Sequence, residues 1–129
     1  MLKTVVVKKS TSSNEAIHAR YCATFSQKLM GLMFSKEIQP DQGLLIVENR
    51  ESRVNTAIHM FFVNYDLAVL WLDKDLVVVD KVLAKKWAPF YMSRKPAQYV
   101  LELHSSKFKD FDIGERLIFT DEPIILAES

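Results

Sequence analysis

The most informative hydrophobic pattern runs from Thr56 to Leu83, a segment rich in β-branched and aromatic residues, with no glycine or proline. Two apolar runs flank a short polar break at residues 73–75, a pattern typical of two core strands joined by a tight turn. The run 67–72 is nearly all apolar, and a strand that is apolar on both faces is covered on both faces. We therefore expect central strands at 54–63, 67–72 and 76–83.

Weaker alternation of apolar and polar residues predicts shorter strands around this centre. These segments are 2–9, 17–23, 44–47, 99–104 and 116–120, with a short edge strand at 123–127. The segments 10–15 and 48–53 are polar and are predicted to be loops.

One helix is predicted after Thr24. Thr24 can cap the helix N-terminus, and Gln27, three residues later, completes a capping box. Gly31 is expected to end or loosen the helix, and Met30 is expected to fill the core. The residues expected on the buried face are Phe25, Leu29, Leu32 and Met33.

This arrangement of elements decides between fold classes. Eight or nine short strands are predicted with one helix, and strands do not alternate with helices, which disfavours a parallel doubly wound sheet. The sequence therefore predicts a mostly-β fold. It would be an antiparallel β-sandwich of jelly-roll type, or a partly open barrel, with one short α-helix.

Length and composition are those of an ordinary soluble domain. The 129 residues predict a single domain over 1–129, with 49% apolar and 26% charged residues. A net charge of +1 gives no reason to expect nucleic acid or a membrane as partner. Neither a signal peptide nor a membrane span is recognisable, so the sequence as written predicts a cytoplasmic protein. Export of an untrimmed precursor stays open.

Five short strings in register resemble one known family. They are G-L-M at 31–33, P-D-Q-G-L-L at 40–45, I-H-M-F-F-V-N-Y-D-L-A-V-L-W-L-D at 58–73, Y-V-L-E-L at 99–103 and I-G-E-R-L at 113–117. Their order and spacing resemble domain-of-unknown-function family 192, a small bacterial and archaeal family, over residues 16–119. The resemblance implies a compact, mostly-β fold of sandwich or jelly-roll type with one short helix. It implies no function, because the family has none assigned.

The sequence departs from the family pattern at three positions. Ala68 stands where relatives have an acidic residue, and Asp66 lies two residues earlier, on the same strand face. Either Asp66 replaces that carboxylate or its role is lost. Leu76 stands where relatives have a turn glycine, so Asp75 is expected to adopt any left-handed conformation. Ser106 replaces the glycine that follows the V-L-E-L string.

Motifs for common catalytic and cofactor chemistry are missing from the sequence. The three histidines have neither H-x-H nor H-x-x-x-H spacing, so no metal site is predicted. Cys22, the only cysteine, can form no internal disulfide, and its place on a predicted strand favours a buried, inert thiol. The three glycines are isolated, so no phosphate-binding loop is available. We predict no cofactor and identify no catalytic residue.

The first candidate ligand-binding residues lie in the central segment. His59 and Asp66 could supply the few polar groups of an otherwise apolar pocket, with Phe62 beside them. The alternative is a core strand with one satisfied histidine.

Three further candidates come from later in the chain. Trp87 lies in the irregular segment 85–96, where cations and aromatic residues mix as in platforms for sugars or single-stranded nucleic acid. A single such run on a near-neutral domain favours loop packing. Glu102 points away from the apolar side of its strand, so we expect it to face solvent, or alternatively the mouth of a barrel. His104 lies at the end of the same strand.

The function favoured by this pattern is a small-molecule or carbohydrate-binding module with a pocket near the central strand pair. Two other classes stay open. One is a protein–protein interaction domain. The sequence does not determine the oligomeric state of the protein. The other is an uncharacterised enzyme, which would need two of four side chains within hydrogen-bond reach in a concave site. These are His59, Asp66, Glu102 and His104.

Overall fold

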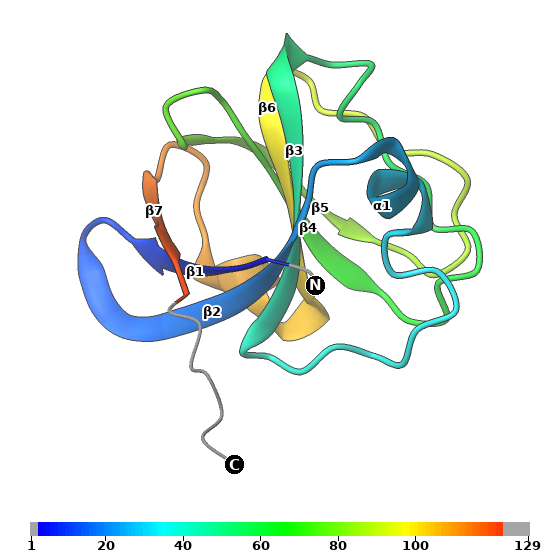
Figure 1. The fold of residues 1–129 in the computed structure, drawn as a ribbon, viewed down its shortest axis with the longest axis horizontal. Helices are drawn as coiled ribbons and strands as arrows, with labels where there is room; N and C mark the ends of the chain where they lie inside the picture. Colours follow the sequence, from blue (N-terminus) through cyan, green and yellow to red (C-terminus); the bar gives the residue numbers. More distant parts are fainter. Residues whose placement is uncertain (1–2, 123–129) are drawn as a thin grey trace.

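The computed structural model describes residues 3–122, apart from the side chains of residues 12–14, Phe25 and Leu29. Its strands are β1 (Thr4–Lys9), β2 (Ser12–Cys22), β3 (Gln42–Ser52), β4 (Leu67–Leu72), β5 (Val78–Ala84), β6 (Ala97–His104) and β7 (Leu117–Asp121). They form one sheet in the order β5-β4-β6-β3-β2-β1-β7 (Figure 1). The predicted mostly-β fold is confirmed. All neighbouring strands are antiparallel except β2 and β3, which run parallel because α1 and a long loop connect them.

The two edges of the sheet approach each other. Val77, just before β5, forms an isolated bridge with Arg116, just before β7. Next to it, the Val78 amide donates to the Glu115 carbonyl at 2.8 Å. The strand pairing does not close completely, so the architecture is that of a partly open barrel.

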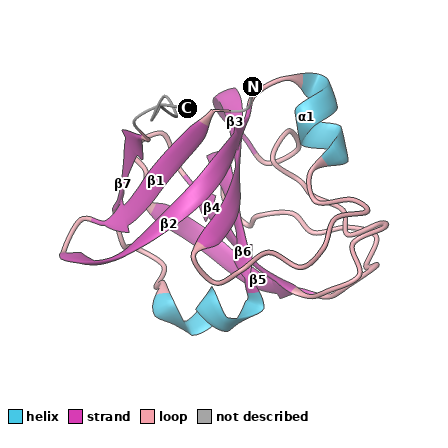
Figure 2. Ribbon diagram, turned by 60° about the horizontal axis from the view of Figure 1, so that its bottom comes forward, coloured by secondary structure: helices cyan, strands magenta, loops and turns pink. Residues whose placement is uncertain are grey.

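Two hydrophobic clusters lie on opposite faces of the central strands. The inner cluster draws on all seven strands and so fills the curl of the sheet: Val5, Val7, Ile17, Ala19, Leu45, Ala68, Leu70, Leu72, Val78, Leu101, Leu103, Phe111 and Leu117. The outer cluster lies beneath α1 and the long loops: Cys22, Leu32, Leu44, Ile46, Ile58, Met60, Val63, Tyr65, Leu67, Val69, Trp71, Ala84, Ala97 and Val100. Figure 2 shows these loops gathered on one side of the sheet, away from β1 and β7.

β4 belongs to both clusters, as its uninterrupted apolar sequence predicts. Its odd-numbered side chains enter the outer cluster and its even-numbered side chains enter the inner cluster. Trp71, which lies in this apolar run, is fully buried, and its Nε1 donates to the Thr56 carbonyl at 2.8 Å. Because the Trp71 indole N–H has this partner, the ring can lie in the interior without a desolvated donor.

The predicted helix is present as α1 (Phe25–Met30), with its capping box. The Gln27 amide donates to Thr24 Oγ1 at 3.2 Å, and the Thr24 amide donates to Gln27 Oε1 at 3.1 Å. Gly31, with φ of 44°, ends the helix as expected. A second, 3-10 helix, η1 (Ser105–Asp110), was not predicted. Within residues 3–122, no helix is long and apolar enough to cross a membrane.

The strand predicted at 54–63 is wrong. This segment is an irregular loop that crosses the outer face of the sheet. It pairs instead with another loop, through an isolated bridge between Ile58 and Tyr91 and a hydrogen bond from the Met60 amide to the Ala88 carbonyl at 2.9 Å. Alternate residues are buried because the extended loop packs onto the sheet, and this produces a strand-like period of two.

Two segments predicted as loops belong to strands. β1 and β2 form a hairpin that takes in most of residues 10–15, and β3 continues through the charged residues to Ser52, which pairs with Ala97. Leu76, and not Asp75, takes the left-handed conformation, with φ of 65°. The Asp73 carboxylate accepts from the Asp75 amide at 2.9 Å and so fixes that end of the turn. The edge strand predicted at 123–127 lies outside the described residues.

Candidate ligand-binding cavity

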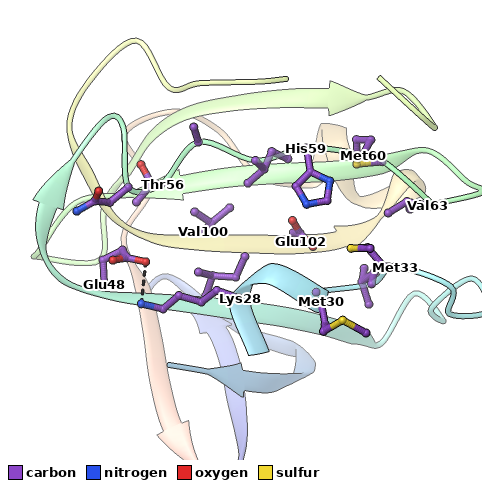
Figure 3. A pocket seen from close by; sticks show the side chains of 16 residues that line it. Lys28, Met30, Met33, Glu48, Thr56, His59, Met60, Val63, Val100 and Glu102 are labelled. Atoms are coloured by element: carbon purple, nitrogen blue, oxygen red, sulfur yellow. Dashed lines mark ion pairs between the residues drawn. The ribbon is translucent and has the colours of Figure 1, made fainter. Parts of the chain in front are cut away.

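A cavity of about 370 Å³ lies on the outer face of the sheet (Figure 3). Alternation along two neighbouring strands places its floor residues on one face: Ile46 and Glu48 on β3, and Val100 and Glu102 on β6. One wall is formed by α1 and residues 31–33, and the facing wall by residues 55–60 and 63. Its volume falls at the small end of the range of ligand pockets in proteins.

The two ends of the cavity differ in polarity. At one end Lys28 of α1 and Glu48 of β3 form an ion pair, with Nζ and Oε2 2.8 Å apart. The other end is lined by methionine and valine side chains, and Figure 3 shows Glu102 between the two ends. These apolar residues are Met30, Met33, Met60 and Val63. Three of the protein's five methionines therefore line one cavity, which gives it an adaptable apolar surface.

Met30 was predicted to fill the core, and this prediction is wrong. Its side chain is 51% exposed at the cavity rim. Met30 is the last residue of α1, and Gly31 turns the chain immediately afterwards, so Leu32 takes the buried position instead. Phe25 and Leu29 were expected on the buried face of the helix together with Leu32, and the structure does not describe their side chains.

Glu102 occupies the centre of the cavity floor, and the expectation that it faces solvent is wrong. Its residue is only 6% exposed. Leu44 and Val69 are its partners on the two neighbouring strands, and both are fully buried. The next strand places Arg20 in the same row, with Leu44 between Arg20 and Glu102. The alternation of β6 does turn Glu102 away from the inner cluster, but α1 and the loop 53–66 cover that side.

No hydrogen bond to the Glu102 carboxyl group is present among the residues that the structure describes, and its oxygens open onto the cavity, since no described buried side-chain oxygen is without a partner. The positive charge that acts on the Glu102 carboxyl group is that of Arg20, whose Nη2 donates to the Gly31 carbonyl at 3.0 Å. Burial raises the pKa of Glu102 from 4.5 to about 7, and Arg20 opposes this only in part. Glu102 is therefore a buried carboxyl group that faces a cavity without a partner.

His59 lies on the wall that faces the sheet. Its Nδ1 accepts a hydrogen bond from the Phe61 amide at 3.2 Å, so in the neutral ring the proton is on Nε2. In this tautomer Nε2 carries the proton and is a hydrogen-bond donor. Nε2 is therefore unavailable as a metal ligand while it is protonated. No ion pair joins His59 to Glu102 within the described part of the chain.

Phe62 and Trp87 do not line the cavity but belong to an exposed group of rings next to it, since the Trp87 amide donates to the carbonyl of the lining residue Met60 at 3.1 Å. We call Phe34, Phe62 and Trp87 the aromatic cluster. The Phe62 ring centroid is 4.7 Å from that of Phe34 and 5.0 Å from that of Trp87. The three residues are 68%, 40% and 46% exposed in chain order. All three have left-handed backbones, with φ between 59° and 62°. Such conformations are unfavourable for large side chains and persist only where surrounding contacts enforce them.

Asp66 and His104 do not line the cavity. Asp66 accepts a hydrogen bond from the Lys86 amide at 2.9 Å and lies 3.5 Å from Lys85 Nζ. Asp66 therefore anchors a loop. It does not replace an acidic side chain at position 68, because Ala68 is buried in the inner cluster. His104 accepts from the Ser106 amide at the start of η1.

Within residues 3–122, no hydrogen bond or ion pair links any two of the four side chains considered for an enzyme. These are His59, Asp66, Glu102 and His104. In the same range, no group of three or more histidine, cysteine or acidic side chains is placed to hold a metal ion. Cys22 is buried, and burial raises the pKa of its thiol, as for an inert cysteine.

Lys28 and Glu48 were missed as cavity residues. Lys28 was not among the residues expected on the buried face of the helix, and Glu48 was assigned to the predicted loop 48–53. A single signal was available: Glu48 continues the alternation of Leu44 and Ile46 and so falls on the same strand face. The meeting of Lys28 with Glu48 depends on how α1 docks, which no local pattern reveals.

Comparison with known families places the chain. The profile of DUF192, described as "Uncharacterized ACR", matches residues 5–119. The chain belongs to this family. The resemblance inferred from the five sequence strings is confirmed, and DUF192 membership carries no assigned function.

Relatives named UPF0127 proteins match part of the chain. A UPF0127 protein of Thermococcus kodakarensis is 43% identical over 79 residues, which are 61% of this chain and 48% of the relative. A UPF0127 protein of Thermococcus gammatolerans is 34% identical over 98 residues, covering 76% of this chain and 62% of the relative. The chain thus spans about half to three fifths of the length of these two relatives.

Two crystal structures share the fold. A Sinorhizobium meliloti protein, provisionally named a transcription regulator, has a TM-score of 0.79 at 22% identity, covering 92% of this chain and 94% of its own. A protein of unknown function from Novosphingobium aromaticivorans has a TM-score of 0.76 at 16% identity, covering 91% of this chain and 84% of its own. At these identities the likeness extends to the fold alone.

Proposed function

We propose that this DUF192 protein binds a small amphipathic molecule in the cavity between α1 and the sheet. The observation that carries the proposal is Glu102, a carboxyl group more than nine-tenths buried that faces the cavity without a hydrogen-bond donor among the described groups. The cavity is the side from which the Glu102 oxygens can be reached, so a ligand that enters it can donate the hydrogen bond that this largely buried carboxyl group lacks.

The remaining lining supports a ligand with an apolar body. Met30, Met33 and Met60 supply flexible, polarizable side chains, which can adapt to ligands of different shape. The Lys28–Glu48 pair offers a polar end, and Nε2 of His59 offers a donor. A mostly apolar wall with a few convergent polar groups is the usual composition of a small-molecule site.

The methionines also provide the test. Met30, Met33 and Met60 line the cavity, whereas Met92 does not, so the methyl group of Met92 is an internal control. We would label the methionine methyls with ¹³C, assign them by single Met→Leu changes, and titrate the protein with hexanol, hexylamine and hexanoate. Saturable shifts of the three cavity methyls, without a shift at Met92, are the expected result. If saturating amounts of all three probes leave these methyls unmoved, the proposal fails.

A second candidate is carbohydrate binding at the aromatic cluster. The observation in its favour is that Phe34, Phe62 and Trp87 stay exposed although their backbones are held in unfavourable conformations. Aromatic faces of this kind can stack against the apolar face of a sugar ring. Trp87 is half-exposed and Trp71 is buried, so quenching of tryptophan fluorescence by an added sugar would report on Trp87. The effect should vanish in Trp87→Phe. Quenching that survives this change would contradict the assignment.

A further inference from the structure

We propose that the ligand of the cavity is a small organic monocation, a primary amine with an apolar tail, whose ammonium group binds the Glu102 carboxylate. This inference rests on the proposed function, because it names the chemical class of the molecule that fills the same site. It comes from the distribution of charge along the cavity walls.

The charges that line the cavity do not balance. Lys28 and Glu48 neutralise each other, since their charged atoms lie 2.8 Å apart. Glu102 is the remaining acidic residue of the lining, and no described cation lies within ion-pair distance of it. With Glu102 ionised and His59 neutral, the lining carries one net negative charge. A ligand with one positive charge complements this lining, whereas a carboxylate ligand would meet repulsion.

Arg20 does not take the role of partner. It lies in the same row across the sheet as Glu102, but the Leu44 side chain comes between them. One of its nitrogens, Nη2, donates to the Gly31 carbonyl at 3.0 Å, and no ion pair between Arg20 and Glu102 is present among the described residues. Arg20 thus contributes a favourable field to a negative charge at Glu102 and leaves the hydrogen-bonding positions of the carboxylate facing the cavity.

The surroundings of Glu102 also favour an ammonium group with an apolar tail over a fully hydrated cation. Leu44 and Val69 flank the carboxyl group on the floor, and the methionine end of the cavity begins beside it. A cation bound here must leave most of its water, and an alkyl chain that fills the methionine end compensates for that loss. A bare metal ion would find no second acidic ligand close by, since Glu48 is paired with Lys28.

The test compares three probes of equal length at about pH 8.5, where Glu102 is ionised. Hexylamine, hexanol and hexanoate would be titrated by calorimetry into the wild-type protein, Glu102→Gln and Glu37→Gln. Glu37 is half-exposed and outside the cavity lining, so Glu37→Gln makes the same chemical change elsewhere. We expect hexylamine to bind about tenfold or more tighter than hexanol to the wild type and to Glu37→Gln. Glu102→Gln should remove this preference, so that hexylamine binds no tighter than hexanol.

The outcomes separate this inference from the proposed function. If hexylamine and hexanol bind equally well and both shift the cavity methionines, the cavity is a binding site but the inference of an amine is overturned. An amine preference that persists in Glu102→Gln overturns the role of Glu102. If neither probe binds, the proposed function fails as well. Circular dichroism of Glu102→Gln would establish that loss of binding does not come from loss of the fold.

Discussion

Replacing Glu102 with glutamine should remove a pH dependence of stability that the buried carboxyl group creates. Glu102 faces Leu44 and Val69 on the neighbouring strands and has no donor among the described groups, so its charged form is disfavoured in the folded state. Burial raises the pKa of Glu102 from 4.5 to about 7. Glutamine has a similar shape and no charge, so it retains the packing and removes the titration.

The sign and size of the effect follow from linkage. Between pH 4.5 and about 7 the folded protein holds a proton on Glu102 that the unfolded chain has released, so the free energy of unfolding falls as pH rises. Below this pH window the contribution of Glu102 to the free energy of unfolding is fully present. Above the window that contribution has been lost. The separation between the two pKa values corresponds to about 3 kcal/mol.

Urea denaturation of the wild type and Glu102→Gln at several values between about pH 5 and about pH 9 measures this directly. Other titrating groups are common to both proteins and cancel in the difference. Over this pH range we expect the free energy of unfolding of the wild type to fall, relative to that of Glu102→Gln, by most of the difference of about 3 kcal/mol. Parallel pH profiles for the two proteins would refute the reasoning, because they would mean that Glu102 is solvated or paired in the folded state.

Three further changes test other parts of the structure, each by urea denaturation. Gly43→Ala should destabilise the protein by about 1–3 kcal/mol, because the new Cβ would lie 2.9 Å from a Leu103 methyl carbon; an unchanged stability would contradict this close packing. Trp71→Phe should cost about 1–3 kcal/mol, since it leaves the buried Thr56 carbonyl without its donor, and a neutral result would indicate that water takes the position. Phe34→Gly should be about 1 kcal/mol more stable than Phe34→Ala, because residue 34 has φ of 59°; the reverse order would show that the backbone there is not left-handed.

Features encoded by neighbouring residues could be predicted from the sequence. The capping box of Thr24 and Gln27 fixed the start of α1, and the apolar run of β4 indicated burial on both faces. The prediction of a strand at 54–63 was wrong because any extended segment that packs on a surface buries every second residue, whether it is a strand or a loop. Ile58 and Met60 are buried by a loop that pairs with another loop, and this pairing depends on residues about 30 positions away.

The candidate site was predicted only in part for the same physical reason. Alternation along β6 correctly separates Glu102 from the inner cluster, but it cannot show that α1 and the loop 53–66 cover the other face. His59 was assigned to the pocket from its place among apolar residues, and it does line the cavity. Asp66 was assigned by the same argument and instead holds the loop at Lys86. Whether a polar residue faces a cavity depends on how distant segments dock.

The double burial of β4 has a consequence for how the molecule opens. Its alternate side chains belong to the inner and outer clusters, and it pairs with β5 on one side and β6 on the other. Neither cluster can come apart without disturbing the strand that serves both, so the two layers should unfold together in one cooperative transition. The amides of β4 should then be among the last to exchange with deuterated solvent. Local opening should be confined to the loops around the cavity, where a ligand would have to enter.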